Sequence, residues 1–362
     1  MILTEALKMF FRSIRYAFFG FHKYNGSAID ICKQIIEDCW NGKYYQTSAG
    51  HFSSFYTRDF GFCTPALIHL GQKERVQKTL EWAMKCFEKS GKLTTSITPS
   101  GKAFDFPTVA PDSLAFFLFS LQHHKELVEE HRHFLNNEID RYYASCVDER
   151  TGLPKPLHFS SIKDHAIRKQ SCYDTVMLGW LANIIAKLGL DNPFAKHNYV
   201  YLLNKYFWNK TYFLDDLSGN KYVSGDANTF PFWCGVIKDA MKRRKATASI
   251  ENAQLDKPFP LKYTAIMPLH RQISAALFAP NYEGTTIWAH LGMLYVEILS
   301  TVDKKKAREH IRKYAKLIEQ HKTFLELYNP NGTIYKTLFY TADEGMLWAA
   351  NYLHLHKHFK AG

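Results

Sequence analysis

Apolar residues recur at the spacing of α-helices along almost the whole of this chain. About twelve such segments follow one another, roughly in pairs, and short joins rich in Gly, Pro and Asn separate them. The alternation that is typical of strands is confined to short pieces at residues 43–48, 93–98 and 333–339. Because no alternation of strands with helices is sustained, the pattern argues against Rossmann and TIM arrangements.

Twelve paired helices in 362 residues predict an all-α toroid, an (α/α)6 barrel with short β-hairpin pieces in its joins. Inner helices must be apolar all round, which fits Leu114–Leu121 and Tyr173–Leu188, whereas the charged, amphipathic segment Lys304–Lys322 fits the outer ring. No Pro/Ser-rich linker divides the chain, so we expect one domain over residues 1–362, with residues 1–24 available as an accessory helix. Eleven expected helices can be bounded, and one or two less regular pieces bring the number to about twelve; the eleven are 27–40, 60–70, 74–89, 112–122, 126–146, 173–188, 194–207, 232–245, 287–301, 304–322 and 341–359.

Membrane-spanning and secreted proteins fit the sequence poorly. The longest purely apolar stretch, Leu114–Phe119, is far shorter than the ~20 residues of a spanning helix. Charged residues interrupt the apolar segment Met1–Phe21, and no small-residue cleavage site follows it. The seven cysteines are scattered, without a CxxC pair, which indicates reduced thiols in the cytoplasm and argues against a disulfide framework or a zinc site.

The chain carries 46 Lys and Arg against 34 Asp and Glu, a net charge of +12, which raises nucleic acid as a partner. The basic cluster at 304–316 is interspersed with acids, as on a solvated outer face, and the cluster at 238–245 accompanies no known nucleic-acid-binding motif. We therefore expect no specific nucleic-acid partner. P-loop, GxGxxG and HExxH motifs are also absent, so we expect no cofactor and no metal, and a homo-oligomer stays open.

Several joins combine acids, aromatics and glycine, a mixture that suits sugars, because a sugar ring offers an apolar face for stacking and a rim of hydroxyls for charged groups. Asp174 precedes an almost uncharged segment, where desolvation raises a carboxyl pKa, and Glu326 stands between apolar residues. For Asp59 and Asp112, capping of a helix N-terminus is an equal or better explanation. The candidate substrate-binding residues are Tyr56, Arg58, Asp59, Asp112, Asp226, Trp233, Tyr282, Gly284, Trp288 and Tyr328.

In their order and spacing, these joins resemble the (α/α)6-barrel glycoside hydrolases: the trehalases, the family 63 group of glucosidase I and mannosylglycerate hydrolase, and the amylo-α-1,6-glucosidases. Glu326, in Glu-x-Tyr-Asn-Pro-x-Gly, is similar to the general-base glutamate of these enzymes, and Asp174, in Ser-Cys-Tyr-Asp, to their general acid. The pair Arg58-Asp59 resembles the pair that holds the sugar, and Tyr282, Gly284 and Trp288 resemble the stretch that lines the pocket. Cys172 and Gln170 depart from the usual Glu-Ser-Gly before the acid.

The resemblance implies a glycosidase that cleaves an α-linked glucoside or a related small glycoside or oligosaccharide with inversion. Asp174 would protonate the glycosidic oxygen, and Glu326 would deprotonate the attacking water. An inverting pair of carboxyl groups lies roughly 6.5–9.5 Å apart.

Three alternatives stay open. One is a sugar isomerase like N-acylglucosamine 2-epimerase, with histidines as acid and base, which the 17 histidines make worth weighing. Another is a non-catalytic carbohydrate-binding barrel. The third is attachment to a membrane surface through Met1–Phe21. The competing explanation for this segment is a helix that packs on the barrel or on a partner subunit.

Overall fold

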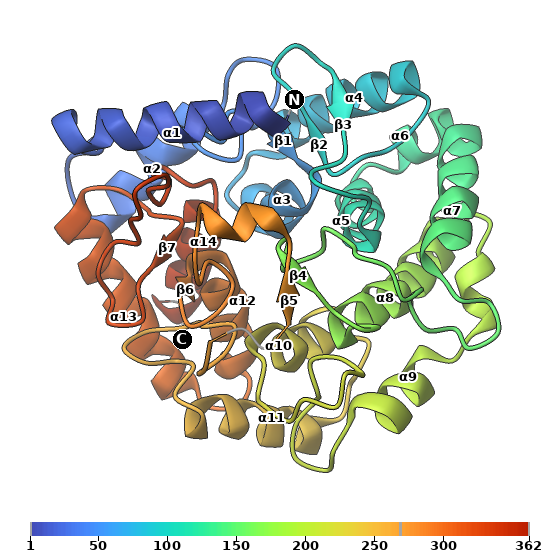
Figure 1. The fold of residues 1–362 in the computed structure, drawn as a ribbon. Coiled ribbons are helices and arrows are strands. Elements are labelled where there is room, and N and C mark those ends of the chain that lie inside the picture. Colours follow the sequence, from blue (N-terminus) through green and yellow to red (C-terminus); the bar gives the residue numbers. More distant parts are fainter. Residues whose placement is uncertain (1, 268–269, 361–362) are drawn as a thin grey trace.

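Six helices that are buried over most of their length form a closed inner ring. The computed structural model of the protein describes residues 2–267 and 270–360. Each inner helix packs against the next, and the last one returns to the first. Figure 1 views the ring end-on; its members are α3 (Thr57–His69), α5 (Pro111–Leu121), α8 (Cys172–Leu188), α10 (Gly225–Trp233), α12 (Ala289–Ser300) and α14 (Ala349–Lys360).

The outer ring packs against the inner one through amphipathic faces. In α13 (Lys304–His321), for example, Ala307, Ile311, Tyr314 and Ile318 are buried at helical spacing, while the lysines face outward. The other outer helices are α2 (Ala28–Cys39), α4 (Lys73–Ser90), α7 (Arg132–Cys146), α9 (Tyr199–Leu202, continued by a π-turn over Leu203–Phe207) and α11 (Ala240–Asn252). Outer and inner helices alternate along the chain, so the predicted all-α (α/α)6 barrel is confirmed. Helices α1 (Ile2–Phe19) and α6 (Lys125–Glu130) are additional.

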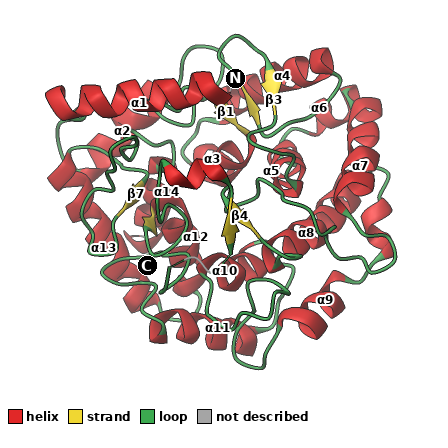
Figure 2. Cartoon of the chain, viewed as in Figure 1, coloured by secondary structure: helices red, strands yellow, loops and turns green. Residues whose placement is uncertain are grey.

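The joins differ sharply between the two ends of the barrel. Short joins such as 70–72 and 301–303 lead from an inner helix to the next outer one, whereas long joins lead into the N-terminus of every inner helix. The long joins carry three small antiparallel sheets (Figure 2). These are β1 (Phe55–Tyr56), β2 (Ser96–Ile97) and β3 (Ala103–Phe104); β4 (Ala166–Ile167) with β5 (Arg271–Gln272); and β6 (Ile287–Trp288) with β7 (Leu327–Tyr328). The end with the long joins is called the mouth below.

Several expected helix bounds are wrong. The expected helix 232–245 does not form: α10 ends at Trp233, Gly235 follows with φ +64°, and Asp239 caps a new helix, α11. The preceding residues, expected to be a join because of their Gly, Asn and Pro, instead form α10. The Asn228 side chain bonds the backbone of Phe213 and Ser224, so it ties the helix to its neighbour and makes no turn.

Three other expected helices are interrupted or start late. The segment 126–146 divides at His131 into α6 and α7, and 194–207 divides at His197, which has extended backbone angles. The last helix begins at Ala349 because residues 342–348 run through the mouth. Within the residues that the structure describes, no helix is long and apolar enough to cross a membrane.

The contact between α3 and α5 depends on a glycine. A Cβ atom at Gly61 would lie 2.5 Å from Cβ of Phe116, and both residues belong to fully packed inner helices. We therefore expect Gly61→Ala to push the two helices apart and to lower the free energy of unfolding by about 1–3 kcal/mol. Thermal unfolding followed by circular dichroism measures this. An unchanged melting temperature would contradict the close approach, because alanine otherwise favours a helix over glycine.

Candidate active site

Four inner helices bring an aspartate to the same end of the barrel. Because every inner helix starts at the mouth, residues in the first turn of each lie at that end. Asp59, Asp112, Asp174 and Asp226 occupy first turns of α3, α5, α8 and α10, and all four are buried. A helix N-terminus stabilises a negative charge, which helps to hold carboxylates in a buried position.

Asp59 and Asp112 do not cap their helices, although capping was the alternative to substrate binding that the sequence left open for both. The N-cap positions of α3 and α5 are Tyr56 and Ala110, and neither makes a side-chain cap hydrogen bond. Burial raises the pKa of Asp59 to about 6, and that of Asp112 to about 7, although the positive charge of Arg58 opposes both shifts. These carboxyl groups therefore change their ionisation near neutral pH.

Arg58 connects three parts of the mouth. Its guanidinium lies 3.3 Å from Oδ2 of Asp112 and 3.3 Å from Oδ2 of Asp164, and it donates a hydrogen bond to the Ser160 carbonyl. The hydroxyl of Tyr173 donates to the same oxygen of Asp112 at 3.0 Å. Arg58 thus holds the join before α8 against the starts of α3 and α5.

Asp174 is held by two hydroxyl groups. Ser171 caps α8 by accepting the amide of Asp174, and its hydroxyl donates to Oδ2 of Asp174 at 2.5 Å. The hydroxyl of Ser161 donates to Oδ1. Burial raises the pKa of Asp174, while Arg168 and the two serines oppose the shift. Ser171, and not Asp174, is thus the N-cap of α8, and the carboxyl group of Asp174 is fixed in orientation.

Glu326 is buried between two tyrosines. It immediately precedes β7, whose pairing with β6 fixes the backbone, and its carbonyl accepts the amide of Ala289. Tyr282 donates to Oε1 at 2.5 Å, Tyr340 donates to Oε2 at 2.6 Å, and the amide of Asp343 donates to Oε2 at 2.9 Å. Burial raises the pKa of Glu326 to about 8, against the lowering effect of these hydrogen bonds.

Aromatic rings surround Glu326. The Tyr282 ring stacks on His165 with 5.3 Å between ring centres and meets Trp288 edge-on at 4.7 Å. Trp288 donates its indole N–H to the Tyr282 carbonyl, and the turn through Gly284 is closed by a hydrogen bond to Asn281. The predicted residues Tyr282, Gly284, Trp288 and Glu326 therefore lie together.

Asp226 belongs to a buried ionic cluster, which we define as Lys163, Arg168, Asp215, Asp226 and His270. The Lys163 ammonium lies 2.9 Å from Asp215 and 3.1 Å from Asp226, and Arg168 lies 3.0 Å from Asp226. His270 contacts Asp215 at 2.8 Å. Burial alone would raise the pKa of Asp215, but the cations and His270 hold it well below its usual range. The cluster ties the join before α8 to the joins before α10 and α12.

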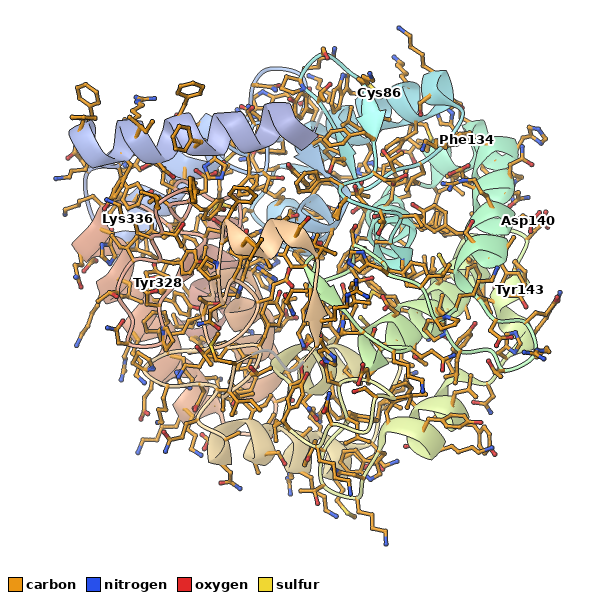
Figure 3. The ribbon with its side chains drawn as sticks, in the orientation of Figure 1. Cys86, Phe134, Asp140, Tyr143, Tyr328 and Lys336 are labelled. Carbon is orange, nitrogen blue, oxygen red and sulfur yellow. The ribbon has the colours of Figure 1, made fainter. Side chains whose placement is uncertain are left out.

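Three predicted site residues make their described contacts elsewhere than with Glu326 and the aromatic rings around it. Trp233, at the far end of α10, packs among Phe116, Phe119 and Trp180, and its indole N–H bonds Glu297. Tyr328 packs on Phe259, and Figure 3 labels it toward α13, away from the centre of the ring. Tyr56 lies in β1, edge-on to Phe52 at 5.6 Å.

The sequence interpretation missed four residues of the mouth: Asp164, His51, Tyr340 and Asp343. Asp164 is a partner of Arg58, and Tyr340 is a partner of Glu326. Asp343 accepts the hydroxyl of Ser48 and the amide of His51, and its carboxylate lies 3.2 Å from the His51 ring. None of the four stands at a helix start, so no local pattern singled them out. Across residues 2–267 and 270–360, no group of three His, Cys, Asp or Glu residues is arranged to hold a metal ion.

No known family profile matches the sequence, and no curated protein is similar to it in sequence. Solved structures are similar in fold. The GH63 mannosylglycerate hydrolase from Thermus thermophilus, in complex with Tris and D-glycerate, has a TM-score of 0.63 and 12% identity, over 91% of this chain and 100% of the hydrolase. A wild-type glycosidase has a TM-score of 0.61 and 14% identity, over 99% of this chain and 98% of its own.

The rhamnosidase from Klebsiella oxytoca, with rhamnose bound, has a TM-score of 0.64 and 12% identity over 92% of this chain. This chain spans 63% of the rhamnosidase's length. At such identities the likeness shows the fold, and it confirms the glycosidase-like (α/α)6 barrel that the sequence motifs predicted.

Proposed function

We propose that this protein is a glycoside hydrolase that cleaves an α-linked glucoside, or a related small glycoside or oligosaccharide, with inversion at the anomeric carbon. The observation that carries the proposal is Glu326. It is a carboxyl group buried at the mouth of a barrel whose solved neighbours include a mannosylglycerate hydrolase and a rhamnosidase, and two tyrosine hydroxyls orient it.

In the proposed reaction, Asp174 is the general acid and Glu326 the general base. Asp174 gives its proton to the glycosidic oxygen as the bond to the anomeric carbon breaks, and Glu326 takes a proton from the water that attacks from the opposite face. The raised pKa of Asp174 favours the protonated form that an acid needs. The pKa of Glu326 near 8 means that the base form increases as the pH rises toward 8.

The surrounding residues support the binding of a carbohydrate. Arg58 and Asp59 offer charged groups for neighbouring hydroxyls, Asp112 and Asp226 accompany them, and the rings of Tyr56, Tyr282 and Trp288 offer faces for stacking. Gly284 shapes the turn beside Tyr282. For Trp233 and Tyr328 a packing role fits their contacts better than contact with a sugar in the mouth.

The experiment is hydrolysis of α-linked disaccharides and glycosyl-glycerates, with NMR of the first-formed anomer. We expect the inverted anomer from the wild type and a loss of about 10²–10⁴-fold in kcat for Asp174→Asn. Asp164→Asn is the comparison variant: Asp164 is also a carboxylate at the mouth but is paired with Arg58, so its loss is expected to act through Arg58 on substrate binding and to raise KM more than it lowers kcat. A retained anomer would contradict inversion, and a fully active Asp174→Asn would remove Asp174 from the role of the acid.

A sugar isomerase is the second candidate, because two histidines flank the two tyrosines that bond Glu326. The His51 ring lies 5.6 Å from that of Tyr340, and the His165 ring stacks on Tyr282. An isomerase of this type would exchange a carbon-bound hydrogen of a free sugar with solvent deuterium. Such exchange without hydrolysis, lost in His51→Gln or His165→Gln, would replace the hydrolase proposal, whereas a non-catalytic sugar-binding barrel would show neither reaction.

We further propose that the protein works in the cytoplasm and that its partner is a carbohydrate, with no specific nucleic-acid target. All seven cysteines are buried, unpaired thiols, which is the arrangement that a reducing compartment preserves. A homo-oligomer remains compatible with this proposal, and light scattering decides it.

A further inference from the structure

Helix α1 presents two different faces. One face packs on the mouth: Arg12 pairs with the buried Glu344, and the hydroxyl of Ser13 donates to the Phe339 carbonyl. The other face is an apolar stripe at positions i, i+3 and i+7, where Phe11, Ile14 and Phe18 are 63%, 40% and 79% exposed. Packing on the barrel therefore explains only half of this amphipathic helix.

The exposed apolar surface continues from α1 onto two joins of the mouth. The Phe339 ring lies 6.2 Å from Phe10 and 5.4 Å from Phe278, and the hydroxyl of Thr337 donates to the Phe278 carbonyl. Leu277 and Leu338 are each 79% exposed. We call the segments 10–23, 265–267, 270–278 and 336–339 the rim; Figure 1 shows α1 and the short helical turn Ser274–Leu277 on the near side of the ring.

The rim concentrates apolar side chains in a way that needs an explanation. Of the fourteen large apolar side chains that are exposed among the described residues, ten belong to the rim. Scattered single residues of this kind are ordinary on a protein surface, but a contiguous group marks a site of interaction.

The charge of the rim is one-sided. The segments 6–23, 257–282 and 327–342, which contain it, have no Asp or Glu, although the chain as a whole has 34. Arg15, Arg271 and Lys336 are exposed there. The Lys336 ammonium lies over the Tyr16 ring at 5.2 Å, and Figure 3 labels Lys336. Aromatic and aliphatic side chains are thus interleaved with cations only.

We propose that the rim docks on the anionic surface of a lipid bilayer, with the mouth of the barrel facing the headgroups. Aromatic and aliphatic side chains enter the boundary between headgroups and acyl chains, while lysine and arginine attract anionic lipids. A second copy of the chain is a poorer occupant, since a two-fold contact would bring two acid-free, basic rims together. The proposal does not depend on hydrolysis.

The test is co-sedimentation of the full chain with vesicles of phosphatidylcholine alone and of phosphatidylcholine with phosphatidylglycerol at a ratio of about 7:3. We expect binding to the anionic vesicles that weakens as salt is added. The triple variant Phe11→Ser/Phe18→Ser/Leu338→Ser, and separately Arg15→Glu/Lys336→Glu, should each bind roughly ten-fold more weakly or worse.

The matched control is Val200→Ser/Met241→Ser, which removes exposed apolar side chains from α9 and α11 on the outer ring. Its binding should equal that of the wild type, and circular dichroism should show all variants folded. Absence of wild-type binding, or an equal loss in the control, would overturn the proposal. The proposal would also be overturned if the wild type bound no vesicles and light scattering showed that it is a dimer which the triple variant dissociates. The rim would then be a contact between two copies of the chain.

Discussion

Replacing Glu326 by glutamine is expected to lower kcat for glycoside hydrolysis by about 10²–10⁴-fold, because the amide cannot accept a proton from water. The substitution keeps the size of the side chain. The amide oxygen can take the hydrogen bonds of Tyr340 and the Asp343 amide, and the amide N–H can donate to Tyr282. Assays of wild type and variant on the same substrate measure the loss.

The same variant should be more stable than the wild type above pH 5. The pKa of Glu326 is about 8 in the folded chain, against an ordinary value of 4.5. Between these values the unfolded chain releases the proton and the folded chain keeps it. Wild-type stability therefore falls as pH rises through this window, by up to about 1.4 kcal/mol per pKa unit. Glutamine does not ionise, so its advantage should grow from pH 5 to pH 8.

Thermal unfolding at pH 5, 6.5 and 8 checks this expectation. Glu37→Gln is the matched control, because the Glu37 side chain is 55% exposed and pairs only on the surface with Arg75. It should show no comparable gain with pH. Equal melting temperatures of Glu326→Gln and wild type at pH 8 would mean that Glu326 is ionised when folded, and a fully active variant would remove Glu326 from the reaction.

Lys163→Met is expected to lower the free energy of unfolding by about 3–5 kcal/mol, the range found when one partner of a buried ion pair is removed. Lys163 is 2% exposed, and its ammonium lies within 3.1 Å of both Asp215 and Asp226. Methionine fills much of the same space without a charge. The loss of stability therefore measures the cost of leaving two buried carboxylates without the positive charge of Lys163. Chemical unfolding with urea at pH 7 measures it.

The matched control is Lys196→Met. The Lys196 side chain is 58% exposed and pairs with the exposed Glu149, so its loss should change stability by less than about 1 kcal/mol. If Lys163→Met were no more destabilising than this control, the buried ionic cluster would contribute little to holding the joins together. The double variant Lys163→Met/Asp226→Asn should recover part of the loss, because it removes one of the uncompensated charges.

The sequence was sufficient for the barrel because its evidence is local. Segments without charge, such as the one that became α8, must be surrounded by protein, and amphipathic segments such as α13 must have one solvated face. Helix ends were harder to predict. Asn228 and Pro231 are common turn residues, but both lie inside α10, where the Asn228 side chain bonds the backbone of Phe213 in the preceding join.

The candidate site was predictable only where a motif or a helix start singled out a residue. Glu326 and Tyr282 stand in such motifs, whereas Tyr340 reaches Glu326 through the folding of a long join. Trp233 shows the opposite difficulty: it is close to Asp226 in sequence, but a step of seven positions along the helix separates the two by about 10 Å along the axis. Arg58 and Asp59 are neighbours in sequence, yet the ion pairs of Arg58 are with Asp112 and Asp164, which no local pattern indicates.

The unequal joins also decide where a reporter group can be attached. At the end opposite the mouth, the join 301–303 follows α12, whose first residue bonds the Glu326 carbonyl, so the twelve residues of that helix separate the join from Glu326 by about 18 Å. A fluorophore on a cysteine introduced at Thr301, which is exposed, would follow rotation of the whole barrel without touching sugar or lipid. The seven native thiols are all buried and would compete little for the label. The same introduced cysteine would allow the protein to be tethered to a surface with its mouth free.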